Sequence, residues 1–178
     1  MPQPLQRLAS AVGDLSGATH RQTADRDSSV SSGTSGSSEH PSAELQTLTA
    51  RTVERALQAL WDGGVLVPVV AWAATNSGEE QHRLFGDPSR IDTDLDHGLQ
   101  LARAYVDAFN CERVERYVWV YDGYAGQSHH EAVVVEVAER GHTHGWLLAA
   151  RYRLSKRGIA LLDRDLVELA TIRTPFTT

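Results

Sequence analysis

The sequence has little that would cross-link the fold or bind nucleic acid. Cys111 is the only cysteine among the 178 residues, so no disulfide can form within the chain. Lys156 is the only lysine, the formal net charge is −6, and no basic run occurs anywhere. This balance argues against a nucleic-acid partner, because such affinity rests on neutralising phosphates. No apolar run approaches the length of a membrane span, so we expect no membrane partner either.

The sequence also lacks the motifs that identify common catalytic, metal-binding and phosphate-binding sites. No Gly-rich phosphate loop, no HExxH and no CxxC spacing occurs. The acidic run Asp163-Arg164-Asp165 is too short for a calcium loop. The first residues, Met1 to Pro4, lack the charged start and apolar stretch of a signal peptide. We therefore expect no cofactor and a cytoplasmic location.

The composition of the chain changes near residue 41. Residues 28–38 read SSVSSGTSGSS, which cannot bury enough apolar surface to offset the entropy lost on ordering. Residues 1–41 are therefore predicted to be a disordered Ser/Gly-rich arm, and residues 42–178 a single domain. A domain of about 137 residues can bury roughly two thirds of its unfolded surface, which is enough for a core.

A short apolar stripe lies within the arm, ahead of the Ser/Gly-rich stretch. Its members are spaced by three and four residues, as on one face of a helix: Leu5, Leu8, Val12 and Leu15. A helix this short is marginal in water. Two interpretations stay open. The stripe is a docking motif that folds in a partner's groove, or it is a frayed terminus without a role.

The first half of the domain alternates between helix and strand patterns. Apolar residues follow helical spacing from Leu45 to Trp61, and Gly63-Gly64 supplies a stop. Residues 65–74 are β-branched and apolar, and Pro68 places this strand at an edge or at a bulge. A turn then leads to a return strand at residues 81–85.

A second helix and a run of strands complete the domain. The helix is predicted to begin at Thr93 in a loose capping box and to end near Asn110. Strands are predicted at residues 114–123, 131–139, 144–153 and 158–162, with short connections that favour antiparallel hairpins. The last stretch, from residue 163, fits either a helix or a strand.

These elements predict an α+β fold. Two helices would pack on one face of a mostly antiparallel sheet in the order α-β-β-α-β-β-β, followed by a further strand or helix. This order of elements resembles the roadblock or longin-type arrangement over residues 42–153, and secretion-chaperone folds have a comparable mix. Proteins of the roadblock or longin shape are commonly dimeric scaffolds or regulators, so the resemblance implies a role of that kind.

The hairpin loops predict which strand residues face each other. A first loop centred near Gly126 puts Trp119 opposite Val133, and a second near Gly141 puts Val135 opposite Leu148. One face then gathers the aromatic and branched residues that the helices would cover. They are Tyr117, Trp119, Tyr121, Val133, Val135, Val137, Trp146, Leu148, Ala150 and Tyr152.

The opposite face of this predicted sheet is polar at its rims and aliphatic at its centre. Arg116 and Glu136 make a cross-strand pair in this register. The apolar centre has the character of an interface, with candidate residues Val118, Val120, Val134, Leu147 and Ala149.

Histidine pairs are the candidates for metal ligands. They are His129-His130 with Glu131, and His142 with His144. The predicted strand separates the two groups by on the order of 35 Å, whereas zinc ligands lie within about 2.3 Å of one ion. We therefore expect no native metal site.

A row of polar residues crosses three strands at one end of the predicted sheet. Asp122, His130 and Arg153 fall side by side in this register, with Ser128 nearby. Asp would orient His, and Arg would hold an anion. Ordinary charge pairing at a solvated strand end explains the same residues.

Two function classes follow from these observations. The first is a non-enzymatic protein-interaction or scaffold module that binds another protein or forms a homodimer through the outer sheet face. The second is a small enzyme or anionic small-ligand binder that uses Asp122, His130 and Arg153. We favour the first, because the sequence contains no catalytic signature.

Overall fold

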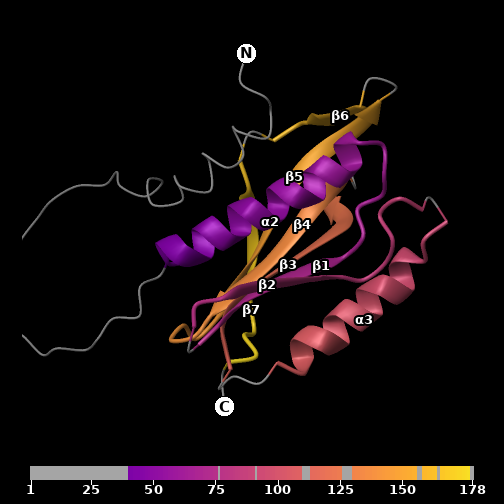
Figure 1. Ribbon diagram of the computed structural model, residues 1–178. Helices are drawn as coiled ribbons and strands as arrows, with labels where there is room; N and C mark the ends of the chain where they lie inside the picture. The colour runs from indigo at the N-terminus through magenta and orange to yellow at the C-terminus, as the bar shows by residue number, and fades with distance from the viewer. Residues whose placement is uncertain are drawn as a thin grey trace, which may run out of the picture.

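The computed structural model describes residues 40–75, 77–90, 92–109, 113–125, 130–155, 158–163 and 165–176. Over these residues the chain forms two helices and one seven-stranded sheet (Figure 1). This confirms the predicted α+β class. The predicted docking stripe of the arm lies outside the described residues, as do Cys111, Ser128 and His129. Neither described helix combines the length and the hydropathy that crossing a bilayer requires.

Helix α2, Ala43–Trp61, begins and ends where its sequence predicts. The side chain of Ser42 caps it by accepting a hydrogen bond of 3.1 Å from the Leu45 amide. Gly63 follows the helix with a positive φ of 80°, a conformation that favours glycine. The buried stripe of α2 holds the predicted apolar residues: Leu45, Leu48, Val53, Ala56, Leu57 and Leu60.

Strands β1, Val69–Ala74, and β2, Glu80–Leu84, form the predicted hairpin. The edge position predicted as one alternative for the first strand is wrong, because β1 also pairs with β3 and is therefore interior to the sheet. Pro68 lies just before the strand, where its missing N–H leaves no gap in the ladder. Its carbonyl accepts a hydrogen bond of 2.9 Å from the Phe85 amide. An irregularity in the pairing with β3 does occur, between Ala73 and Ala74.

Helix α3, Leu95–Asp107, begins one residue later than its predicted capping box. Asp94 is the N-cap, since its carboxylate accepts a hydrogen bond of 2.9 Å from the His97 amide. The Thr93 hydroxyl instead donates to the carbonyl of Asp87. Ala108 is the C-cap, ahead of Asn110, which lies outside the described residues.

The remaining strands are all antiparallel to their neighbours. They are β3, Val114–Ala125; β4, His130–Glu139; β5, Gly145–Ser155; β6, Gly158–Leu161; and β7, Val167–Ile172. The sheet runs in the order β2-β1-β3-β4-β5-β6, and β7 pairs with the other half of β5. The stretch that fitted either a helix or a strand is therefore a strand.

The register of the second hairpin is confirmed, and that of the first is wrong. Val135 lies opposite Leu148 as predicted, but Trp119 lies opposite Glu136 and not opposite Val133. Pairing continues to the end of both strands, where Ala125 faces His130, so the connection is centred beyond Gly126. The error is an odd number of residues, and an odd shift moves every side chain of β3 to the other face.

The two helices lie on opposite faces of the sheet, contrary to the prediction that both cover one face. On the α2 face, Val118 and Val120 of β3 join the core under α2 with Val133, Val135, Val137, Trp146, Leu148, Ala150 and Tyr152. On the α3 face, Tyr117 and Trp119 of β3 pack against Ala102 and Val106 of α3. Figure 1 shows the strands between the two helices.

The approach of α3 to the sheet depends on Gly98. A Cβ built on this residue would overlap the carbonyl oxygen of Phe85 and lie 3.4 Å from the Pro68 ring. No side chain fits between α3 and the segment that follows β2. The absence of a side chain at Gly98 therefore sets how closely the helix packs.

Candidate functional site

The structure separates the predicted polar row. Asp122 lies on the α2 face, where its carboxylate accepts a hydrogen bond of 2.8 Å from the Tyr152 hydroxyl. His130 faces Ala125 on β3, so its side chain lies on the α3 face. Arg153 alternates with buried Tyr152 and also points away from the α2 face. Asp122 therefore cannot orient His130, and the predicted triad of charges does not form.

Burial shifts the pKa of both residues of the Asp122–Tyr152 pair. It raises the pKa of Asp122, and the hydrogen bond from Tyr152 opposes this shift. Burial, followed by the nearby charge of Asp122, raises the pKa of Tyr152. The tyrosine thus stays a hydrogen-bond donor at neutral pH, and the pair fixes β3 relative to β5.

The ion pair that does form at this end of the sheet uses Arg151 and not Arg153. Arg151 Nη2 lies 2.6 Å from Asp163 Oδ1, and its backbone amide donates to Oδ2 at 2.7 Å. The hydrogen bond from Arg151 lowers the pKa of Asp163 below its usual range. The contact ties the segment after β6 to β5. The sequence analysis did not predict this pair.

Replacing Asp163 by asparagine is expected to reduce stability only above acidic pH. A lowered folded-state pKa contributes stability that is present above the unfolded value and lost as pH falls through the folded one. We expect the variant to lose about 1 kcal/mol at neutral pH, since Arg151 is partly exposed. The difference should shrink towards zero below about pH 4. Urea unfolding at neutral and acidic pH measures it, with exposed Asp165→Asn as the control. An equal loss at both pH values would contradict the assignment.

The five predicted interface residues do not share an exposed face. Val118 and Val120 are fully buried under α2. Val134 and Ala149 lie on the α3 face, but they are only 5% and 2% exposed. Leu147 is half-buried beside them. The outer sheet face predicted as an interface is therefore not an exposed surface, because the register error placed residues of both faces on one side.

A buried carboxylate on the α3 face is the most constrained polar group between α3 and the sheet. Glu136 is 4% exposed and accepts two hydrogen bonds from Arg103 of α3, at 3.2 and 3.1 Å. The Tyr117 hydroxyl donates to the same carboxylate at 3.1 Å. The Arg103 guanidinium also stacks over the Trp119 ring, 4.4 Å from its centroid. Glu136 is the one charged residue within the apolar run of residues 133–138. This position in the sequence was the signal that the glutamate is buried against a cationic partner.

Two open cavities adjoin this cluster and share Arg103 and Asp107 in their linings. The first, about 430 Å³, is walled by Trp119 and Tyr121, and the second, about 350 Å³, by Tyr117 and Glu136. Burial, followed by the charge of Glu136, raises the pKa of Tyr117. Arg103 and Tyr117 both donate hydrogen bonds to Glu136. The cluster holds α3 on the sheet.

A second buried carboxylate joins the start of α2 to the end of β4. Glu139 accepts hydrogen bonds from the Ser42 amide at 2.7 Å and from the Ser42 hydroxyl at 2.6 Å. His142 Nδ1 lies 3.6 Å from the same carboxylate. These are residue types of a hydrolase triad, but the serine donates to the carboxylate and not to histidine. The arrangement therefore clamps the helix and does not activate Ser42.

The described part of the chain has no cluster of carboxylate, thiol and imidazole side chains that could bind a metal ion. Over those residues no group of three or more His, Cys, Asp or Glu side chains is placed to hold a metal ion. His142 and His144 each contact the Trp146 ring edge-on. Their described contacts are those of packed side chains.

The edge strands β2 and β7 differ in charge. All five residues of β2 are exposed, and they include Glu80, His82 and Arg83. On β7, Val167 and Leu169 are 51% and 45% exposed, and the strand carries a single charge, that of Glu168. Within the described residues β7 pairs only with β5, so its other side is free. This edge is an apolar, unpaired strand.

Comparison with known proteins gives no relative. No family model, no curated protein and no solved structure matches the chain. The similarity to the roadblock or longin-type arrangement is therefore one of element order alone.

Proposed function

We propose that this chain is a non-enzymatic protein-interaction module that forms a homodimer through the free edge of β7. The observation that carries the proposal is the exposed six-residue strand at the edge of the sheet, with Val167 and Leu169 half exposed and one charged residue. A row of unpaired backbone N–H and C=O groups beside apolar side chains is a template for another strand.

The contrast between the two edges supports β7 over β2. Natural sheets protect their edges with charged side chains, and β2 has Glu80 and Arg83 on either side of His82. The β7 edge carries only one charged side chain, that of Glu168. Pairing there would satisfy backbone groups and cover apolar side chains at the same time.

A second copy of the chain is the occupant that the strand fits best. Two identical edges pair antiparallel around a two-fold axis, so each protomer supplies the same surface. An axis near Ala170 keeps the two Glu168 carboxylates at opposite ends of the paired segment. The two carboxylates then do not face each other. Like charges directly opposite each other would destabilise the pair. The resulting dimer has one sheet continuous across both protomers.

Sedimentation velocity on the full chain over a range of concentrations tests this proposal. We expect a monomer–dimer equilibrium for the unaltered chain. Leu169→Lys should weaken it by about tenfold or more, because a lysine ammonium in each strand must be desolvated on pairing. Leu84→Lys is the matched control, since Leu84 is 44% exposed on the opposite edge and Leu169 is 45% exposed.

Two outcomes would overturn the proposal. One is an unaltered chain that stays monomeric at every concentration reached. The other is a dimer that Leu84→Lys and Leu169→Lys weaken equally. Circular dichroism of both variants checks that each retains the fold.

The alternative, an anionic-ligand binder or small enzyme on the Asp122–His130–Arg153 row, has less support. Its chemistry requires the three side chains to converge, and Asp122 is hydrogen-bonded on the other side of the sheet.

A further inference from the structure

A compact cavity lies between the second half of α2, the end of β2 and the segments that flank β1. Its volume is about 190 Å³. The walls are apolar and come from Ala56, Ala59, Leu66, Val67, Val69 and Pro88. It lies on the α2 face, far in the fold from the Arg103–Glu136 cluster of the α3 face. An apolar recess of this kind is the common form of a small-molecule site.

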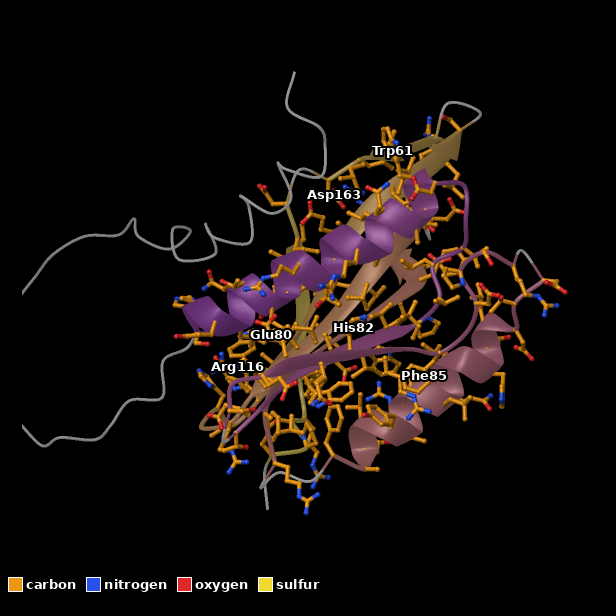
Figure 2. The ribbon with its side chains drawn as sticks, viewed as in Figure 1. Trp61, Glu80, His82, Phe85, Arg116 and Asp163 are labelled. Atoms are coloured by element: carbon orange, nitrogen blue, oxygen red, sulfur yellow. The ribbon has the colours of Figure 1, made fainter. Side chains whose placement is uncertain are left out.

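The rim of the cavity carries two nitrogen-rich side chains. Arg55 of α2 donates from Nη1 to His82 Nδ1 at 3.4 Å, and Leu84 lies beside them. An arginine can only donate, so His82 accepts through Nδ1 and its other ring nitrogen carries the proton. Figure 2 shows His82 and Glu80 on β2 beneath α2.

Arg55 differs from the arginine one turn earlier. Arg51 forms an ion pair of 2.6 Å with Glu80, which neutralises it. Within the described residues no carboxylate lies within ion-pair distance of Arg55, and its one hydrogen bond is to the His82 ring. The cavity rim therefore presents a cation that lacks an anion.

We propose that this cavity binds a small monocarboxylate with an apolar tail of about six carbon atoms. A dry apolar cavity of about 150 Å³ accommodates benzene, so 190 Å³ takes a phenyl ring or a short alkyl chain. The carboxylate would lie at the rim, where the planar guanidinium of Arg55 donates two parallel hydrogen bonds. The ring N–H of His82 is a third donor for the same group.

Titration of the full chain with hexanoate and benzoate, followed by calorimetry or amide NMR shifts, tests the site. We expect saturable binding of both, and binding at least tenfold weaker for acetate, which lacks the tail, and for hexanol, which lacks the charge. Arg55→Gln should weaken hexanoate binding by about tenfold or more. Arg51→Gln is the matched control on the same helix face and should leave binding nearly unchanged.

A variant that fills the cavity gives a second, independent readout. Ala59→Leu retains Arg55 and His82 but occupies the recess, so hexanoate should no longer bind while the unfolding midpoint shows that the fold persists. The proposal is overturned if acetate binds as well as hexanoate, if Arg51→Gln and Arg55→Gln lose equal affinity, or if Ala59→Leu binds normally. None of these outcomes depends on whether the chain dimerises through β7.

Discussion

Replacing Gly98 by alanine is expected to destabilise the domain by about 1–3 kcal/mol. In an ordinary helix interior the same change is favourable by about 1 kcal/mol, so the expected sign is reversed. The added methyl group would overlap the carbonyl oxygen of Phe85. That carbonyl cannot move away easily, because the Phe85 amide is hydrogen-bonded to Pro68 at 2.9 Å. The helix must therefore lift from the sheet and loosen the packing of Ala102 and Val106.

Thermal and urea unfolding of Gly98→Ala measure this effect. Gln100→Ala, an exposed change on the same helix, is the control and should shift the free energy of unfolding by no more than about 0.5 kcal/mol. A midpoint raised by Gly98→Ala would show that helix propensity dominates. That result would contradict the close approach of α3 to the segment after β2.

Replacing Arg103 by methionine is expected to cost about 2–4 kcal/mol. The loss comes mainly from Glu136, whose carboxylate is 4% exposed and would retain only the hydrogen bond from Tyr117. Arg103 is itself about half exposed, which keeps the effect below that of a fully buried pair. The variant also loses the stacking of the guanidinium on Trp119.

A second substitution distinguishes an unpaired charge from lost packing. Adding Glu136→Gln to Arg103→Met removes the buried charge while its amide oxygen still accepts from Tyr117, so we expect most of the stability to return. Arg90→Met is the matched control, because the Arg90–Asp92 pair is exposed at 63% and 72% and should contribute less than about 1 kcal/mol. Failure of the double variant to recover would assign the loss to packing.

Local features of the fold were predictable from the sequence because their causes are local. The apolar spacing of α2 and the Gly63 that ends it lie next to one another in the chain. The hairpin from β4 to β5 has a tight turn at Gly141, and its register followed from that turn.

The features that determine function depend on contacts between distant residues, and these were not predictable. Gly126 was a reasonable turn signal, yet strand pairing runs as far as the Ala125–His130 pair, which centres the connection beyond Gly126, and no local residue reports this. Because of this register error, the prediction placed Val118 on the same face as Val134, and Asp122 on the same face as His130. The partners Arg103 and Glu136 are 33 positions apart, and Ser42 and Glu139 are 97 apart. Such pairs can be predicted only when it is known which face of the sheet each strand residue occupies.

The separation between α2 and the strands that cover it has a consequence for synthesis of the chain. The apolar stripe of α2 packs on β3, β4 and β5, and the last of these strands begins at Gly145, about a hundred residues after Leu45. At about 5–20 residues per second, the ribosome takes roughly 5–20 s to deliver that strand. During this interval the sheet that covers the helix is incomplete, so its leucines are not fully buried. The Ser42–Glu139 clamp closes only when β4 has left the exit tunnel, so the first of the described helices to be made is among the last elements to be secured.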